Sequence, residues 1–283
     1  MKIKSLLWVL VIVLTISNAV IWVSILQGAK DPVLKVSFLN VGQGDAIFIE
    51  SPSGIQLLVD SGPNLSVLRA LGKEMSFFDR SIDAILATHP DADHIGGFPE
   101  ILKRYKVGNV LLTTNESQTP VFLAYRSEIL NEGAPSKELL RGNIVDLGAG
   151  VFLEILFPDR NLSGADPNTS SVVARLVYGE TSFLLTGDSP IKIENFLSLI
   201  DGTNLKAGVL KVGHHGSRTS SSKAFLSAVS PEYAVISAGC NNRYGHPHKE
   251  VVANLSEIES EILSTCESGT IRFESDGKVV VLK

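Results

Sequence analysis

The chain has no surplus of positive charge, and this absence limits what it can bind. Its 25 Lys and Arg stand against 30 Asp and Glu, which gives a formal net charge of −5 over 283 residues. Proteins that bind nucleic acid tightly without sequence preference usually carry a basic patch or a basic overall charge. The composition argues against such a binder, while an anionic substrate stays compatible if bound cations make a cleft locally positive.

Cysteine is equally scarce, since only Cys240 and Cys266 are present. Their separation along the chain says nothing about their distance in space. The two could pair outside the cell, but two unpaired thiols in the core are the simpler expectation. The chain also has no internal repeat, no low-complexity segment and no sign of a second globular domain.

Charge is missing altogether from Ser5 to Ala29. As a helix this stretch would be roughly 37 Å long, enough to cross a bilayer. Lys2 and Lys4 precede it, so the positive-inside rule predicts a cytoplasmic amino terminus and export of residue 30 onward. These lysines are the only charges before residue 30, so the exported part carries −5 − 2 = −7.

A cleaved signal peptide is the alternative to an anchor. Ser17-Asn18-Ala19 has the small-x-small form of a cleavage site, but the apolar stretch continues to Leu26. We therefore expect residues 1–29 to be an uncleaved anchor and 30–283 to be a single domain. The protein would lie in the cell membrane as a single-pass protein with an extracellular or periplasmic domain, or be secreted if the terminus is cleaved.

All six histidines fall in three short segments, and none is scattered elsewhere. The densest segment, 88–97, carries His89, Asp91, Asp93 and His94 directly after an apolar run that indicates a buried strand. Imidazole nitrogens and carboxylate oxygens are ligands for Zn²⁺, Mn²⁺ or iron. The segment predicts a site for one or two divalent cations, against the plainer alternative of a polar loop with a helix N-cap at Asp93.

Three later junctions, each directly after a predicted strand, also carry histidine or aspartate: Asp188, His214-His215 and His246-Pro247-His248. Ligands of α/β sheets bind at the carboxyl ends of the strands. We therefore expect these groups to meet the segment 88–97 in one cleft.

Four polar residues near these junctions have ordinary structural alternatives. Asp60 ends a strand near the predicted site, but Asp-Ser-Gly-Pro is also common turn sequence. Asp188 could serve only as a helix-start carboxylate. Ser217 and Asn242 could contact substrate, but capping and turn formation are the simpler roles for them.

The hydrophobic pattern predicts a mixed α/β domain from residue 33 onward. Short apolar runs bounded by Gly, Pro and Asp indicate strands at 34–39, 46–50, 55–59, 82–87, 110–113, two within 143–157, a hairpin at 172–186, 205–212, 233–238 and two or three within 261–283. The pattern indicates helices at 66–74, 99–105, 119–131, 190–200, 221–229 and 249–259, and Pro stands at or next to the start of three of them, at 99, 120 and 190.

Taken in order, the motifs resemble those of the metallo-β-lactamase superfamily: His89-x-Asp91-x-Asp93-His94 with Gly96-Gly97, Gly187-Asp188, His214-His215-Gly216-Ser217 and Gly245-His246-Pro247-His248. The opening Asn40-Val41-Gly42-Gln43-Gly44-Asp45-Ala46 makes the chain similar to the hydrolase domain at the carboxyl end of the ComEC competence proteins. The resemblance covers about residue 33 to the end. It implies an α/β fold, a four-layer αββα sandwich, with a dinuclear metal site along one edge.

The resemblance also implies roles for the motif residues. One cation would be bound by His89 and Asp91, the other by Asp93 and His94, with Asp188 as the bridge. The remaining ligands would be His214 and His246. The residues with a direct part in catalysis would be Asp93, His215 and His248, with Asp60, Asn168, Ser217 and Asn242 around the site or in contact with substrate.

The chain departs from the superfamily pattern twice. Asp91 replaces the usual second histidine of its motif, and no histidine lies between His94 and Asp188, where many members supply a ligand. The polar residues 168–171 occupy that region. A site richer in oxygen ligands suits Mn²⁺ more than a three-histidine site would, and Zn²⁺ remains compatible.

The expected activity is that of an exported, metal-dependent phosphodiesterase or nuclease that uses two divalent cations and a metal-bound hydroxide. His215 or His248 would protonate the leaving oxygen. Two alternatives remain open: a hydrolase of another ester or amide, such as a lactone or thioester, and a non-catalytic metal-binding module of a surface complex. A lactamase is disfavoured by the missing middle histidine.

The resemblance implies DNA, or another phosphodiester, as partner and a link to DNA uptake or degradation. With a single apolar span, the chain cannot itself conduct DNA. It would work with separate uptake proteins or serve another extracellular purpose, and its oligomeric state is open.

Overall fold

The computed structural model describes residues 2–27 and 33–283, and the chain divides into two compact units, 1–32 and 33–283. In the first unit, helix α1 (Lys2–Gln27) contains an 18-residue span, Leu6–Val23, with a mean hydropathy of 2.5. By length and composition this helix could cross a membrane, and a signal sequence would have the same properties. The predicted boundary between residues 29 and 30 lies outside the described residues.

The second unit begins with one β-sheet and the helices that cover it. Eight strands are joined in the order β15-β14-β1-β2-β3-β4-β5-β6. The strands are β1 (Leu34–Phe38), β2 (Ile47–Glu50), β3 (Gln56–Val59), β4 (Ser81–Ala87), β5 (Lys106–Leu112), β6 (Ser136–Glu138), β14 (Ile271–Ser275) and β15 (Val280–Leu282). The helices that follow strands of this sheet are α2 (Ser66–Glu74), α3 (Ala92–Ile95), α4 (Phe98–Arg104) and α5 (Pro120–Glu132).

A second sheet has seven strands in the order β13-β12-β11-β10-β9-β8-β7. The strands are β7 (Ile144–Asp146), β8 (Val151–Phe157), β9 (Val173–Tyr178), β10 (Thr181–Leu185), β11 (Val209–Lys211), β12 (Tyr233–Ile236) and β13 (Glu261–Ser264). The helices are α6 (Ile191–Asp201), α7 (Lys223–Val229), α8 (Lys249–Glu257) and α9 (Thr265–Ser268), with short 3-10 helices η1 (Asn168–Ser170), η2 (Gly202–Leu205) and η3 (Gly213–Gly216).

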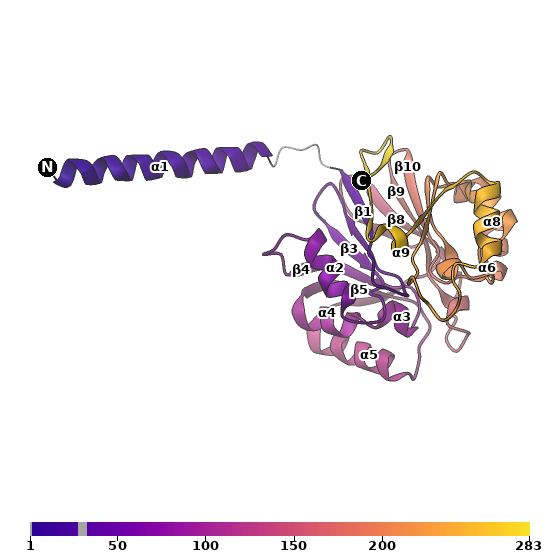
Figure 1. Cartoon of the computed structure of the whole chain (residues 1–283). Helices are drawn as coiled ribbons and strands as arrows, with labels where there is room; N and C mark the ends of the chain where they lie inside the picture. The colour runs from indigo at the N-terminus through magenta and orange to yellow at the C-terminus, as the bar shows by residue number, and fades with distance from the viewer. Residues whose placement is uncertain (1, 28–32) are drawn as a thin grey trace. The chain divides into compact units, whose positions relative to one another are not determined.

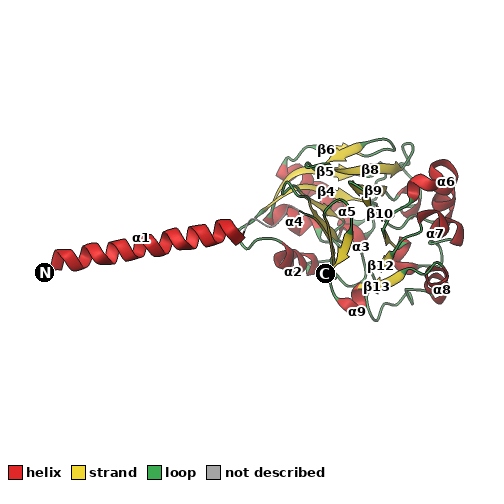
Figure 2. Ribbon diagram, turned by 90° about the horizontal axis from the view of Figure 1, so that it is seen from above, coloured by secondary structure: helices red, strands yellow, loops and turns green. Residues whose placement is uncertain are grey.

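Three apolar cores hold these layers together. The residues between the sheets alternate along their strands, as Val36 and Phe38 of β1 and Leu153 and Ile155 of β8 do, because strand side chains point to opposite faces in turn. A second core joins the first sheet to α2, α4 and α5, and a third joins the second sheet to α6, α7 and α8. Figures 1 and 2 show the sheets between these two groups of helices. The predicted αββα sandwich is confirmed.

The topology brings several strand ends to one edge. Strands β3, β4 and β5 are parallel to one another, and so are β10, β11 and β12. The carboxyl ends of parallel strands meet at the same edge of a sheet, which is where ligands bind in α/β folds. The residues that follow β3, β4, β10 and β11 are those singled out from the sequence.

Most predicted elements occur within a few residues of their expected bounds, and the differences concern short elements. Strand β11 is only three residues long, and η2 includes Leu205, the first residue of the segment predicted as strand. Helix α3, strand β6 and helix α9 were not predicted. They are three to four residues long, too short for a periodic pattern to reveal.

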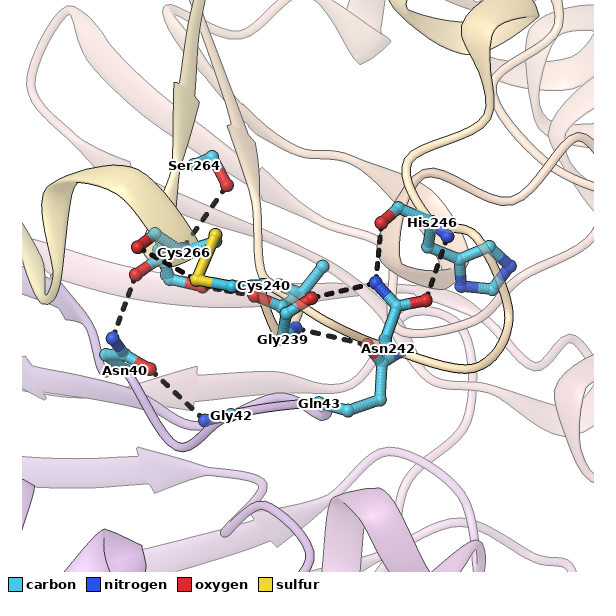
Figure 3. The surroundings of a disulfide bond; sticks show 11 residues. Asn40, Gly42, Gln43, Gly239, Cys240, Asn242, His246, Ser264 and Cys266 are labelled. Carbon is cyan, nitrogen blue, oxygen red and sulfur yellow. Dashed lines mark hydrogen bonds between the residues drawn. A yellow bond between two sulfur atoms is a disulfide. The ribbon is translucent and has the colours of Figure 1, made fainter.

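The expectation of two unpaired core thiols is wrong. Cys240 and Cys266 form a disulfide with a Cα–Cα distance of 4.8 Å, and Cys240 is exposed (Figure 3). Helix α9, which the sequence did not predict, carries Cys266 back to the loop after β12. A disulfide is typical of oxidising compartments, which agrees with export.

Candidate metal centre

Asp188 lies at the centre of a cluster of four imidazoles. Its Oδ1 is 3.3 Å from Nε2 of His94, and its Oδ2 is 3.5 Å from Nε2 of His215, 3.6 Å from Nε2 of His214 and 3.9 Å from Nε2 of His89. These groups come from the ends of β4, β10 and β11. Segments more than a hundred positions apart in the chain thus bring their Nε2 atoms to one carboxylate.

Two further carboxylates lie on the open side of the cluster. Asp91 Oδ2 is 3.7 Å from Nε2 of His89, and Asp93 Oδ2 is 3.4 Å from Nε2 of His215. Their side chains are 42% and 32% exposed, whereas those of His89 and His215 are buried. Solvent therefore reaches the cluster at these two carboxylates and at His214, whose side chain is 25% exposed, while His89, His94 and His215 are buried.

The Nδ1 atom of each of the four imidazoles already has a partner. In His94 it binds Asp60 Oδ2 at 2.7 Å, and in His215 it donates to the carbonyl of Ser237 at 2.8 Å. In His89 and His214 it contacts the hydroxyls of Thr88 at 3.0 Å and Thr219 at 2.9 Å. A hydrogen bond at Nδ1 directs the lone pair of the neutral ring to Nε2, the usual arrangement in metal-ligating histidines.

The unpaired atoms of the cluster fit a divalent cation. Nε2 of His89, His94 and His215 and Oδ1 of Asp188 are buried and have no hydrogen-bond partner among the described residues. Buried polar atoms are nearly always paired, so such a set calls for a ligand. Neutral imidazole nitrogen with carboxylate oxygen suits Zn²⁺ or Mn²⁺. The cluster is therefore a buried site of His and Asp residues that fits a metal ion, as the sequence predicts.

Burial and mutual charge set the protonation of the cluster. Burial, followed by the neighbouring His94, lowers the pKa of His89 to about 3. Burial opposes the charged form of His215, but the carboxylates of Asp188 and Asp45 outweigh it and raise its pKa to about 9. Burial and the charge of Asp93 raise the pKa of Asp91 to about 6. A cation would compete with protons for the same lone pairs, so cation affinity should fall as the pH falls.

Two residues that sequence reasoning missed support the cluster from behind. Asp45 lies 3.4 Å from Nδ1 of His215 and 3.8 Å from Nδ1 of His94, and it pairs with the ammonium of Lys211. Lys211 also donates to the carbonyl of Gly187 at 2.9 Å and lies 3.7 Å from Asp188. One atom each of Asp45, His94, Asp188 and His215 lies within 4.8 Å of the others. Asp45 faces the Nδ1 atoms of these rings and not their Nε2 atoms. We therefore infer that it orients the imidazoles and does not bind the cation.

A close approach of the backbone fixes Asp45 in this position. Its amide donates to the carbonyl of Asp93 at 3.2 Å. A Cβ on Gly44 would lie 2.2 Å from that same carbonyl oxygen, so only glycine fits there. The Gly-Asp pair in the opening motif is therefore a signal that could have identified Asp45 from the sequence.

The other predicted site residues lie around this cluster. The His246 ring centroid is 5.6 Å from that of His214 and 6.4 Å from that of His215, and the two nitrogens of His248 face Arg218. The Asn242 side chain bonds to its own loop, and Ser217 accepts hydrogen bonds from Thr219. Asn168 lies in η1 with its Oδ1 buried and unpaired, and Ser171, three residues on, accepts a hydrogen bond from the Asp188 amide at 3.1 Å.

Asp60 orients His94, and its loss should weaken cation binding. Asp60 is 1% exposed, and it accepts hydrogen bonds from both the amide and the hydroxyl of Thr88 as well as contacting His94. Removing such an orienting partner typically costs a factor of roughly 10–100 in metal affinity. We expect a loss of that size in Asp60→Ala, measured by titration calorimetry with Mn²⁺ and Zn²⁺.

Asp79→Ala is the matched control, because Asp79 bonds Gln56 and Ser81 and has no contact with the cluster. Its cation affinity should equal that of the wild type. An Asp60→Ala protein that folds and binds cations as tightly as the wild type would contradict the orienting role.

Comparison with known proteins agrees with this geometry. The sequence model of the metallo-beta-lactamase superfamily matches residues 39–239. The chain is 32% identical to ComE operon protein 3 of Bacillus subtilis over 262 residues, 87% of this chain and 33% of that protein. It is 34% identical to competence protein ComA of Neisseria gonorrhoeae over 239 residues, 84% of this chain and 32% of that protein. The chain thus spans about a third of the length of these relatives.

Solved structures support the fold. The metallo-beta-lactamase fold protein YhfI from Bacillus subtilis aligns with a TM-score of 0.59 at 12% identity, covering 86% of this chain and 100% of that protein. The metallo hydrolase Igni18 from Ignicoccus hospitalis aligns with a TM-score of 0.54 at 16% identity, covering 86% of this chain and 100% of that protein. At such identities the likeness concerns the fold alone. The chain belongs to the metallo-β-lactamase superfamily and is related to the ComEC-type competence proteins.

Proposed function

We propose that this protein is an exported, membrane-anchored phosphodiesterase that cleaves DNA with the help of two divalent cations. The observation that carries the proposal is the pairing of ligands around Asp188. Its Oδ2 lies within 4 Å of Nε2 of His89, His214 and His215, and its Oδ1 lies 3.3 Å from Nε2 of His94. Asp91 lies next to His89 and Asp93 next to His215. We assign His89, Asp91 and His214 to one cation and Asp93, His94 and His215 to the other. Each cation would then have two imidazoles, one carboxylate of its own and a share of Asp188, with Zn²⁺ or Mn²⁺ as the metal.

This assignment makes His215 a cation ligand, whereas the family resemblance implies that His246 is one. Support comes from burial and contact: His215 is 1% exposed and reaches both Asp93 and Asp188, whereas His246 is half-buried and lies outside the ring of Nε2 atoms. Burial, followed by the charge of His214, lowers the pKa of His246 to about 4, so its ring is neutral. We assign His246 to contact with the substrate phosphate at the mouth of the site.

The catalytic work divides between the bound cations and the protein. Two divalent cations held at such a site would lower the pKa of a bound water and offset the charge of a phosphodiester. Asp188 and the four imidazoles would hold these cations, and Asp93, which lies next to His215, would be a ligand of one of them. The Arg218 amide donates to Nδ1 of His248 at 3.1 Å, and the Arg218 guanidinium, which can only donate, lies 3.2 Å from Nε2 of the same ring. His248 would deliver a proton to the leaving oxygen from Nε2 once the substrate phosphate draws this guanidinium away.

DNA is the preferred substrate because the chain is related to the competence protein ComA and to ComE operon protein 3. The disulfide and the apolar span Leu6–Val23 support export and a membrane anchor. The relation to competence proteins also supports a role for uptake proteins that bring DNA to this domain. The acidic charge favours a substrate that binds through the cations rather than through a basic surface.

The test is cleavage by the purified protein with Mn²⁺ or Zn²⁺ added after chelation. Labelled single-stranded DNA, double-stranded DNA, a bis-nitrophenyl phosphate, a lactone and a thioester form the panel. We expect cation-dependent cleavage of DNA and of the small phosphodiester. Cleavage of only the lactone or thioester would replace the proposal by another ester hydrolase. If the protein binds cations stoichiometrically but cleaves none of the substrates, it would instead be a non-catalytic metal-binding module.

A further inference from the structure

The loop after β12, residues 237–248, carries His246 and His248 and is crosslinked to another element. We call it the histidine loop. Its Cys240 is bonded to Cys266 of α9, and Cys240 is exposed while Cys266 is half-buried. A disulfide in contact with solvent is accessible to reductants and is more easily reduced than a buried structural one.

The opening turn of the domain reinforces the crosslink. Gln43 accepts a hydrogen bond from the Gly239 amide at 3.1 Å, and Asn40 donates to the carbonyl of Thr265 at 2.9 Å (Figure 3). Thr265 in turn accepts a hydrogen bond from the Ala238 amide at 3.2 Å. The start of the histidine loop, α9 and the turn 40–45 thus form one connected assembly around the disulfide.

Asn242 connects this assembly to His246. Its Nδ2 donates to the carbonyls of Gly239 at 2.8 Å and His246 at 2.6 Å, and its Oδ1 accepts from the His246 amide at 2.9 Å. Figure 3 shows Asn242 between Gly239, next to the disulfide, and the backbone of His246. A displacement at Gly239 and Cys240 would therefore be passed to His246 through one side chain.

The far end of the histidine loop rests on η3. The His248 amide donates to the carbonyl of Gly216 at 2.9 Å. A Cβ on Gly216 would lie 2.6 Å from the Cβ of Pro247, so the two backbones are in close contact there. The histidine loop is held at both ends. Between them Asn242, the stacking of Tyr244 on His246, and the contacts of the His246 ring with His214 and His215 brace it.

We propose that the Cys240–Cys266 disulfide and Gln43 position the histidine loop, so that the enzyme reaches full activity only when the disulfide is formed. This inference rests on the proposed function, because it assigns His246 and His248 to substrate. It makes activity conditional on an oxidising compartment. The proposed cation ligands come from segments that do not carry the disulfide, and among them His215 has a hydrogen bond to the histidine loop, at Ser237. Cation binding should therefore survive reduction.

Reduction by a water-soluble phosphine provides the test. The phosphine attacks one sulfur and breaks the S–S bond, water hydrolyses the thiophosphonium to the phosphine oxide, and Cys240 and Cys266 are released as thiols. The phosphine is removed by desalting, and free thiols are counted by mass spectrometry after alkylation of a sample. Full-length protein in detergent is assayed for kcat and KM on a small phosphodiester, for bound cations, and for amide hydrogen exchange of residues 241–248.

We expect reduced protein to keep its bound cations, to exchange faster at 241–248, and to lose roughly 10- to 100-fold in kcat/KM, because small misplacements of catalytic groups cost factors of that order. Cys240→Ser/Cys266→Ser should match the reduced protein and be insensitive to phosphine. Gln43→Ala should lower kcat/KM with the disulfide intact, since it frees Gly239 without touching either sulfur.

Two outcomes would overturn the proposal. The first is reduced protein with two free thiols but unchanged exchange and kcat/KM. The second is reduced protein that loses its cations or unfolds, which would make the disulfide a general stabiliser. If oxidised protein cleaves no substrate at all, the proposed function fails, and the exchange measurement still decides whether the disulfide holds the histidine loop.

Discussion

Replacing Asp188 with alanine should abolish cation binding at the cluster and, with it, phosphodiester cleavage. Asp188 is the carboxylate that lies within 4 Å of all four Nε2 atoms, at 3.3 to 3.9 Å. In the proposed dinuclear site, neither cation would then keep its shared ligand, and the spacing between the two charges would no longer be fixed. The loss in kcat should be at least as large as the roughly 10²–10³-fold typical for removal of one preorganised electrostatic group.

The measurement is cleavage of labelled DNA and of a small phosphodiester with Mn²⁺, together with bound metal by elemental analysis. Asp188→Asn keeps the size of the side chain and removes its charge, so it separates charge from packing. We expect Asn to retain little cation binding, because a neutral amide oxygen is a weaker ligand than a carboxylate. Wild-type cleavage by a folded Asp188→Ala protein would rule out the dinuclear centre.

The second large effect concerns stability. Lys211 is 1% exposed, and its ammonium is enclosed by Asp45, the carbonyl of Gly187 and Asp188. Lys211→Met removes this positive charge, so the buried carboxylates of Asp45 and Asp188 lose a cationic neighbour. Breaking a buried ion pair by removing one partner costs roughly 3–5 kcal/mol. For a domain of this size that corresponds to a fall in Tm of the order of 10 °C.

Thermal unfolding in the presence of a chelator measures this effect without help from bound cations. The matched variant is Lys211→Met/Asp45→Asn, which removes both members of the closest pair. It should be more stable than Lys211→Met alone, because one uncompensated buried charge is gone. Equal Tm values for Lys211→Met and the wild type would show that Lys211 does not neutralise the cluster.

The sequence predicts the cluster well because the chemistry of its residue types is local. Imidazoles and carboxylates that directly follow strands can be recognised without coordinates, and the parallel strands bring His94, Asp188 and His214 together as expected. Asp45 was harder to recognise, because in the sequence it is one residue of a glycine-rich turn. Lys211 had a signal that was not used: a lysine among the apolar residues of a short buried strand needs a negative partner.

The sequence pattern does not predict which of two histidines lies next to Asp188. His215 and His246 both follow strands of the second sheet, and nothing in their neighbours tells which one comes within 4 Å of Asp188. The choice depends on the left-handed backbone of His214 and His215, with φ of 49° and 55°, which turns both rings toward the cluster. The pairing of Cys240 with Cys266 depends on α9, which is too short to predict.

The direction of β1 has a consequence for how a long polymer can reach the enzyme. Strand β1 is antiparallel to β2, and β2 is antiparallel to β3, so β1 runs in the same direction as β3 and β4. Leu34, the first residue of β1, therefore lies at the opposite end of this sheet from His89, roughly a strand length of 15–25 Å away. A domain anchored through its amino-terminal end, as proposed above, would thus be tethered at the rim opposite the metal cluster, and the cluster rim would be free for a thread-like substrate.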